Sequence, residues 1–245
     1  MLVDYRREGG VGIVTLNRPD RKNSIGQDML EELEGAWQRF GEDSRAWVGV
    51  LVGNGPTFCA GRDIKGDMAP LRRTRLNEFF VPETDKPLIA GVRGHVIGLG
   101  WYMAAGCDYV VAGTDSRFWM SQLRVGLPGP YNFAPRLNLS AHIAFEILVL
   151  GRPLDADRAE RLGAINEVVE PDAVDERAVA VASELLELPP GQVRLTKRVL
   201  QGVDRQVPET VKHLYWEGRE ELEGHPDTAE ARAALRERRA PHFTG

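Results

Sequence analysis

The chain has 245 residues, 42% of them hydrophobic and 27% charged, and a formal net charge of −5. This length suits one large domain, or one domain with a helical extension. The excess of acidic residues argues against a general nucleic-acid binder, but a local cluster of Arg and Lys could still bind an anionic small molecule. No apolar run reaches membrane-spanning length and the N-terminus lacks a signal core, so we expect a soluble cytoplasmic protein without nucleic-acid or membrane partners.

The first half of the chain alternates between strand and helix patterns. Residues 2–7 and 11–16 predict a hairpin that closes at Gly9–Gly10. Residues 26–40 carry apolar side chains at helical spacing. Further strands are predicted over 48–52, 88–92 and 109–112, and a helix over 99–106. Strands that alternate with helices imply βαβ units, so we expect an α/β fold with a parallel core.

From about residue 140 the pattern becomes mostly helical. The helical stretches cover 141–150, 155–162, 172–187, 192–201 and 208–237. Asp155 and Pro208 stand near plausible helix starts, and residues 151–154 and 189–191 are predicted to be connectors. We therefore expect a core over residues 1–190 and a helical C-terminal region over residues 191–245.

A glycine-rich turn followed by an apolar helix occupies residues 94–108, with the sequence GHVIGLGWYMAAGCD. Glycine allows backbone conformations that other residues avoid, and a helix start presents N–H groups without intrahelical partners. Those N–H groups, at the positive end of the helix dipole, can hold a developing oxyanion. Alternatively, Gly98 and Gly100 only permit close packing. A dinucleotide site is excluded because no third glycine follows at the required spacing.

Cysteine, histidine and serine patterns exclude several other kinds of site. Cys59 and Cys107 are the only cysteines, and their apolar surroundings favour buried free thiols over a disulfide. No serine has the context of a nucleophile elbow. We predict no metal, because metal-ligand spacing is missing among the remaining histidines, His142, His213, His225 and His242.

Three segments, in order along the chain, resemble the crotonase superfamily of enoyl-CoA hydratase/isomerase-like proteins. They are residues 58–65 (FCAGRDIK), 94–108, and 118–129 (FWMSQLRVGLPG), and weaker similarity covers nearly the whole chain. The resemblance implies a crotonase-like α/β spiral of repeated ββα turns with two roughly perpendicular sheets. It also implies a mostly helical C-terminal region that packs against neighbouring subunits, in a homotrimer or homohexamer.

The same resemblance implies that the protein binds acyl-CoA thioesters. Members of the superfamily stabilise an enolate or tetrahedral oxyanion at the thioester oxygen with two backbone N–H groups. Carried over by position, these groups belong to Arg62 and Leu99, and neither role needs a particular side chain. Coenzyme A would enter as part of the substrate, and we expect no permanently bound cofactor.

The resemblance also places a further set of residues along the substrate and its coenzyme A moiety. This set is Arg21, Lys22, Ala60, Gly61, Asp63, Ile64, Lys65, His95, Gly98, Gly100 and Trp119. Arg21, Lys22 and Lys65 either contact phosphates or are solvated loop charges. Asp63 is expected to hold its own turn, and Trp119 either lines the acyl pocket or packs in the core.

Hydratases of the superfamily use two glutamates, and this chain has neither. By position, the first glutamate is replaced by Tyr102, three residues after Leu99, and the second by Gln122, four residues after Phe118. Glutamine cannot ionise, and tyrosine has an ordinary pKa of about 10. The two-glutamate hydration mechanism is therefore absent from this sequence.

Three interpretations of this replacement stay open. In the first, Tyr102 acts as a general acid toward an enolate formed by decarboxylation or retro-aldol cleavage. In the second, another residue acts as the base, with His95 and Tyr131 as candidates. In the third, catalysis is lost and the protein only binds acyl-CoA. The leading expectation is an enzyme of the lyase or isomerase class with weak or no hydration of crotonyl-CoA. The alternative is a non-catalytic acyl-CoA-binding protein.

Overall fold

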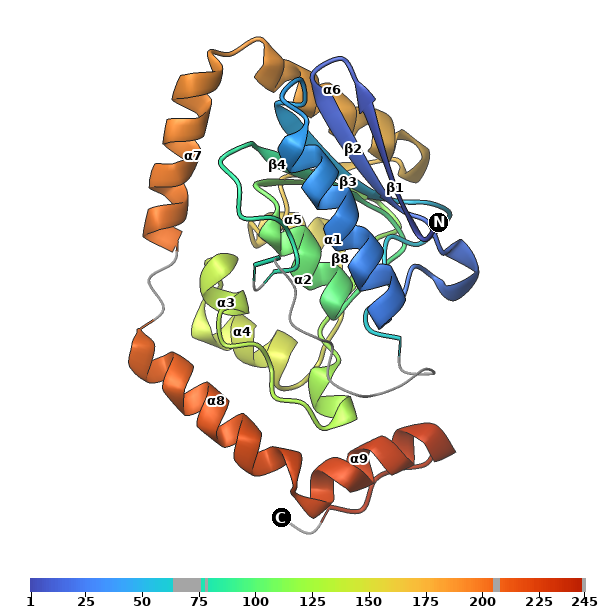
Figure 1. Cartoon of the computed structure of the whole chain (residues 1–245). Helices are drawn as coiled ribbons and strands as arrows, with labels where there is room; N and C mark the ends of the chain where they lie inside the picture. The colour runs from blue at the N-terminus through green and yellow to red at the C-terminus, as the bar shows by residue number, and fades with distance from the viewer. Residues whose placement is uncertain (64–75, 78, 205–207, 244–245) are drawn as a thin grey trace.

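The computed structural model describes residues 1–63, 76–77, 79–204 and 208–243, and its α/β architecture confirms the expected fold class (Figure 1). The strands are β1 Val3–Glu8, β2 Val11–Leu16, β3 Val48–Gly53, β4 Leu88–Val92, β5 His95–Ile97, β6 Tyr109–Gly113, β7 Arg117–Trp119, β8 Leu154–Asp155 and β9 Glu167–Val169. The α-helices are α1 Gln27–Glu42, α2 Leu99–Gly106, α3 Phe133–Arg136, α4 Ala141–Leu148, α5 Ala156–Arg161, α6 Val174–Leu186, α7 Pro190–Asp204, α8 Glu209–Glu223 and α9 Pro226–Glu237. Short 3-10 helices are η1 Pro19–Arg21, η2 Gln122–Val125 and η3 Pro171–Ala173.

Two sheets organise the core. The main sheet has six strands in the order β1-β2-β3-β4-β6-β9. Strands β1 and β2 form the predicted antiparallel hairpin, and every later neighbouring pair in this sheet is parallel. The smaller sheet has the order β5-β7-β8, with His95 of β5 opposite Arg117 of β7. The chain therefore leaves the main sheet after Val92 and enters the smaller sheet at His95, immediately before helix α2.

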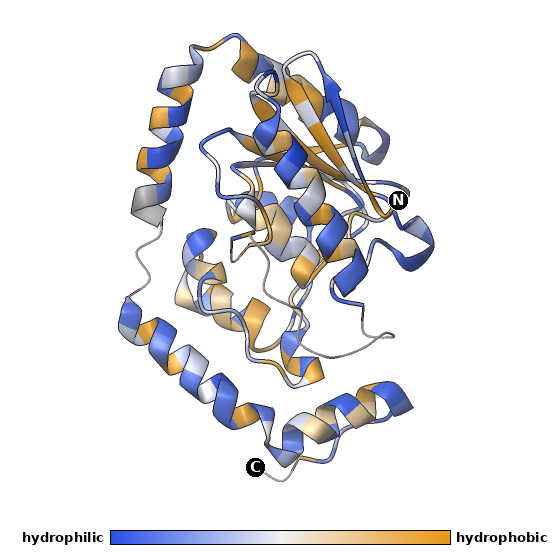
Figure 2. Cartoon of the chain, viewed as in Figure 1, coloured by the Kyte–Doolittle hydropathy of each residue, from blue (hydrophilic) through white to orange (hydrophobic). Residues whose placement is uncertain are grey.

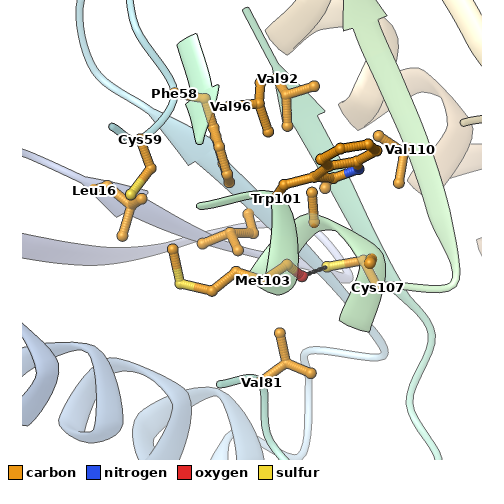
Figure 3. Close-up of a cluster of buried hydrophobic side chains, with 14 of the residues drawn as sticks. Leu16, Phe58, Cys59, Val81, Val92, Val96, Trp101, Met103, Cys107 and Val110 are labelled. Atoms are coloured by element: carbon orange, nitrogen blue, oxygen red, sulfur yellow. Dashed lines mark hydrogen bonds between the residues drawn. The ribbon is translucent and has the colours of Figure 1, made fainter. Parts of the chain in front are cut away.

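The two faces of the main sheet are covered by different helices. Along β2 and β3, Val14, Leu16 and Leu51 join the large core cluster with α1 and α2, whereas Val48 and Val50 face the cluster beneath α6. This alternation is the two-residue period of a strand buried on both sides. The large cluster continues into the glycine turn, where the side chains of α2 pack on those of β5 (Figure 3).

Several boundaries differ from the predicted ones. The predicted helix over 208–237 is two helices, because Pro226 occupies the first position of α9, where a missing N–H is tolerated, and cannot continue α8. For the same reason Pro190 begins α7 inside the predicted connector. The sequence does not predict β5, β7, β8 or β9, because strands of two or three residues carry no readable alternation.

The C-terminal helices α8 and α9 contact the segment 125–131 of their own chain. Tyr215 of α8 packs on Tyr131, with ring centroids 5.0 Å apart. Arg232 Nε of α9 donates a hydrogen bond to the Val125 carbonyl (3.4 Å). Figure 1 shows α8 passing below α3 and α4 before the chain turns into α9. Among the described residues, no helix is long and apolar enough to cross a membrane.

Helix α7 is anchored to the core by a buried lysine. Lys197 Nζ donates a hydrogen bond to the Lys86 carbonyl (2.6 Å) and lies 2.7 Å from Asp108 Oδ2. The same Asp108 oxygen accepts a hydrogen bond from the backbone N–H of Leu88 (2.7 Å) at the start of β4. One lysine therefore connects α7 to both the beginning of β4 and the end of α2.

We expect Lys197→Met to lower the free energy of unfolding by about 2 kcal/mol, because it removes one partner of a largely buried ion pair. Arg194→Met on the same helix is the control. It removes an exposed pair with Asp85 at 3.9 Å and should cost about 0.5 kcal/mol. Urea unfolding followed by circular dichroism measures both values. Equal losses in the two variants would contradict the anchoring role of Lys197.

Candidate active site

The segment around Cys59 runs alongside strand β5. Cys59 N donates a hydrogen bond to the His95 carbonyl (3.0 Å), and Ile97 N donates one to the Cys59 carbonyl (3.0 Å). Figure 3 shows the side chains of Cys59 and Val96 in the same buried cluster as Trp101 of α2. The first two motif segments, which are distant in sequence, are therefore neighbours in the fold.

Gly61 brings the backbone of the first motif against the start of α2. Its φ is +91°, and a Cβ at this position would lie 2.8 Å from the Ile97 carbonyl oxygen and 3.7 Å from the Leu99 nitrogen. Both the left-handed φ and the close approach require glycine. The next residue, Arg62, forms a parallel bridge with Ile25. The 61–62 backbone is thereby held between residue 25 on one side and residues 97–99 on the other.

Helix α2 begins at Leu99, directly after Gly98, whose φ is 53°. The Gly98 N–H donates a hydrogen bond to the Trp119 carbonyl (2.8 Å), and the Tyr102 N–H donates one to the Gly98 carbonyl (2.9 Å). The N–H groups of Leu99 and Gly100 precede that bond and have no partner within the helix. Together with the helix dipole they create a local preference for negative charge beside residues 59–62.

Tyr102 lies one helical turn after Leu99, between two aromatic rings. Its ring stacks on Phe79 (centroids 4.6 Å apart, 28° between planes) and on Phe133 (5.9 Å, 24°). Its hydroxyl donates a hydrogen bond to Oδ1 of Asn132. Tyr102 is thus a half-buried phenol held by side chains from two other segments.

Gln122 begins η2, and its side chain lies near Gly98. A Cβ built on Gly98 would be 3.9 Å from Gln122 Nε2. The Nε2 group donates a hydrogen bond to Met120 Sδ (3.3 Å), and Oε1 is buried with no hydrogen-bond partner among the described residues. Gln122 therefore places a side-chain amide close to the start of α2, with an oxygen that accepts no hydrogen bond from the described residues.

The basic loop before α1 is attached to the first motif. Ala60 N donates a hydrogen bond to the Lys22 carbonyl (2.9 Å), and Arg21 and Lys22 are exposed. Asp63 Oδ2 lies 3.1 Å from a guanidinium nitrogen of Arg18, so its carboxylate connects this loop to the motif. Ile64 and Lys65, which we expected along the coenzyme A path, lie outside the described residues.

His95 and Trp119 lie on the two paired strands of the smaller sheet. The side chain of His95 is largely exposed. Its partial burial and the charge of Lys22 lower its pKa, and Asp115 acts in the opposite direction.

Gly100, three residues beyond β5, packs against Cys59, because a Cβ at Gly100 would be 2.5 Å from the Cys59 carbonyl oxygen. Trp119 Nε1 donates a hydrogen bond to the Gly151 carbonyl (2.7 Å), and its ring lies beneath the Arg124 guanidinium at 5.5 Å. The lowered pKa favours the neutral imidazole of His95, and the indole N–H of Trp119 is bonded to the protein itself.

The two cysteines are free, buried thiols, as the sequence predicts. Burial raises the pKa of Cys59 to about 12 and that of Cys107 to about 12. Both thiols therefore stay protonated near neutral pH and are poor nucleophiles. Within the part of the chain that the structure describes, no group of three or more His, Cys, Asp or Glu side chains is placed to hold a metal ion.

Three residues near Tyr102 are absent from the sequence-based candidates: Phe79, Asn132 and Phe133. Asn132 precedes α3, which is typical of a helix cap, and the two phenylalanines have the pattern of core residues. No local signal distinguishes these roles from contact with Tyr102. They could be assigned only after the positions of Phe79 and of residues 132–133 beside α2 were known.

Comparison with known proteins finds relatives that match nearly the whole chain. The family model described as enoyl-CoA hydratase/isomerase matches residues 6–245. The (E)-benzylidenesuccinyl-CoA hydratase of Thauera aromatica is 32% identical over 250 residues, which cover 96% of each chain. The mevalonyl-coenzyme A hydratase of Aspergillus fumigatus is 33% identical over 194 residues, or 75% of this chain and 72% of that protein.

Solved structures share the whole fold. An enoyl-CoA hydratase/isomerase from Pseudoalteromonas atlantica has a TM-score of 0.87 and 27% identity, with 100% of both chains covered. A carnitinyl-CoA hydratase from Mycobacterium avium has a TM-score of 0.86 and 28% identity, with 99% of this chain and 98% of that chain covered. With the family match spanning nearly the entire sequence, the chain belongs to the enoyl-CoA hydratase/isomerase family of the crotonase superfamily.

Proposed function

We propose that this protein acts on an acyl-CoA thioester and stabilises its enolate or tetrahedral oxyanion with the backbone N–H groups of Arg62 and Leu99. The observation that supports this proposal is that Gly61 lies close to the start of α2. A Cβ built at Gly61 would lie 3.7 Å from the Leu99 nitrogen. The N–H groups of Arg62 and Leu99, which are distant in sequence, would then both donate hydrogen bonds to the thioester oxygen. Each such donor typically contributes about two to three powers of ten in rate.

The coenzyme A moiety is proposed to lie along the loop that carries Arg21 and Lys22. This loop is joined to the first motif through the hydrogen bond from Ala60 N to the Lys22 carbonyl. Exposed basic side chains at that junction suit the phosphates of coenzyme A, which would enter as part of the substrate. The proposed reaction requires no permanently bound cofactor.

The proposed reaction does not use the two-glutamate hydration mechanism. The resemblance assigns Tyr102 and Gln122 to the two glutamate positions, and an amide or an ordinary phenol carries no negative charge at neutral pH with which to abstract a proton. The relatives named above are hydratases of particular CoA esters. We therefore propose a lyase or isomerase reaction of an acyl-CoA, with weak or no hydration of crotonyl-CoA.

A second candidate function is non-catalytic binding of acyl-CoA. It is favoured by two hydrogen bonds within the protein. The Tyr102 hydroxyl donates to Asn132, and the Gln122 amide donates to Met120. In this case the backbone donors bind the thioester oxygen but no group moves a proton.

Incubation with a panel of CoA esters in D2O separates the two candidates. The panel contains acyl-, enoyl-, malonyl- and β-hydroxyacyl-CoA, and products are followed by mass. Deuterium at the α-carbon would report an enolate, whereas gain of water, loss of CO2 or release of free CoA would each identify a reaction. Tight binding without any change in mass would contradict the enzymatic proposal and support the binding protein.

We also propose that the protein assembles as a homotrimer or a dimer of trimers. Apolar side chains recur along exposed faces of α7 and α8 (Figure 2), including Leu195, Val199, Val211 and Leu214. Leu214 is 73% exposed, and together with the other exposed apolar side chains of α7 and α8 it forms a run of the kind that marks an interface. A second copy of the chain would bury these faces.

Light scattering coupled to size exclusion tests this assembly, with three or six times 27.2 kDa as the expected mass. Leu214→Glu should lower the mass, because it places a charge on the apolar face. His213→Glu adds the same charge at the neighbouring, exposed position and should leave the mass unchanged. A wild-type mass of one chain would contradict the proposed assembly.

A further inference from the structure

The short helix α3 is clamped to the end of α2. Arg136 Nε donates a hydrogen bond to the Ala105 carbonyl (2.8 Å), and its Nη2 donates one to the Cys107 carbonyl (2.9 Å). These carbonyls belong to the last turn of α2, which has no intrahelical donors for them. These two bonds attach residues 132–136 to the C-terminal end of α2.

Asn132 uses its side chain in an unusual way for its position. It is the residue that precedes α3, where asparagine normally accepts a hydrogen bond from an N–H of its own helix. No such side-chain cap is present, and Oδ1 instead accepts a hydrogen bond from the hydroxyl of Tyr102 on α2. Asn132 is only 7% exposed, so this contact is made away from bulk water.

The contacts of Tyr102 leave its side chain little freedom. Phe79 and Phe133 stack on the ring, with centroids 4.6 and 5.9 Å away, and both planes lie within 28° of the tyrosine ring. Stacking of this kind restrains the plane of the ring but still allows the ring to slide within that plane. The bond from the hydroxyl to Asn132 adds the fixed point at the far end of the ring.

We propose that Asn132 is a positioning residue for Tyr102, holding its hydroxyl at a fixed place one helical turn beyond the Leu99 N–H. The inference rests on the proposed function and on the first of the three open interpretations, in which Tyr102 acts as a general acid toward the enolate. Because the amide carbonyl is a neutral acceptor, it stabilises the protonated phenol. The site thus presents an uncharged, oriented phenol where the superfamily's hydratases carry a carboxylate.

A double-mutant cycle tests the positioning on the substrate identified with the CoA-ester panel. Asn132→Leu removes the acceptor and should lower kcat about tenfold, the equivalent of one lost hydrogen bond, with little change in KM. In a Tyr102→Phe background the same substitution should have almost no further effect. An equal loss in both backgrounds would show that Asn132 only supports the fold, and would overturn the proposal.

Titration of Tyr102 provides a second readout that needs no substrate. The absorbance difference between wild type and Tyr102→Phe isolates this phenol from the other tyrosines. Asn132→Asp keeps an acceptor but adds a negative charge, so the pKa of Tyr102 should rise by about one unit or more. Asn138→Asp places the same charge in the same segment, without contact to Tyr102 in the structure, and should leave that pKa unchanged.

The two readouts separate failure of the inference from failure of the proposed function. If no CoA ester reacts, the proposed catalytic function fails, but the titration still decides whether Asn132 holds Tyr102. If Asn132→Asp and Asn138→Asp give the same pKa, the pairing itself is wrong. Circular dichroism of Asn132→Leu confirms folding first, and Asn132→Asp, which retains an acceptor, keeps the test decisive if the leucine variant does not fold.

Discussion

Replacing Leu99 with proline is expected to lower kcat for the acyl-CoA substrate by about two to three powers of ten, while binding of the CoA ester is largely retained. Leu99 is the first residue of α2. Proline is tolerated at that position, because the missing N–H has no intrahelical partner and the fixed φ suits a helix start. The substitution therefore removes the proposed donor and leaves the helix in place. Steady-state kinetics and a dissociation constant for the CoA ester measure the two effects.

Leu99→Ala is the matched control. It keeps the N–H but removes a partly buried side chain that packs against the core. We expect kcat within about tenfold of wild type, since only packing around the donor changes. Both variants should lose about 1–2 kcal/mol of stability, so their folding is compared first by thermal unfolding. If folded proline and alanine variants have the same kcat, the Leu99 N–H does not stabilise the oxyanion.

The double substitution Tyr102→Glu with Gln122→Glu is expected to create hydration of crotonyl-CoA, about 10²- to 10⁴-fold above the wild-type rate. This range is what positioned general acid–base groups contribute. One carboxyl would lie a helical turn from the Leu99 N–H, and the other would lie near Gly98, where Gln122 Nε2 is now found. Loss of the enoyl absorbance on addition of water measures the reaction directly.

Tyr102→Gln, which leaves the native Gln122, is the control for this gain. It presents amides at both positions and loses the same ring stacking on Phe79 and Phe133 as the double variant. That loss should cost about 2–4 kcal/mol of stability in either variant. A double variant that folds and binds crotonyl-CoA, yet hydrates it no faster than the amide control, would show that the two positions are wrongly assigned.

The sequence was a good guide wherever a structural element is long and periodic. Residues 26–40 predict a helix that runs over Gln27–Glu42, and its apolar stripe is buried as expected. The predicted helix over 99–106 has the same bounds as α2. Such elements are determined by local propensity and by one apolar face, both of which can be counted along the chain. The short strands β5, β7 and β8 exist only because tertiary pairing supplies their hydrogen bonds.

In the candidate site, too, local backbone features could be predicted from the sequence and contacts between distant segments could not. Its glycine turns could be predicted, because Gly61 and Gly98 both have positive φ, and at Gly61 another segment also comes close. The side-chain contacts of the site could not be predicted. The partner of Tyr102 is 30 residues away, and nothing in the sequence around Asn132 distinguishes it from an ordinary helix cap.

By itself, the sequence determined the family resemblance, the α/β class and the order of the main elements, and it predicts that Tyr102 and Gln122 replace the two glutamates. The tertiary structure alone decided that Gly61 lies against Leu99, that Asn132 accepts from Tyr102, and that Lys197 anchors α7 to Asp108. The physical reason is that periodicity and turn chemistry act over a few neighbouring residues. Contacts between distant segments depend on how the sheets and helices pack, and that packing sets the distances on which chemistry at the site depends.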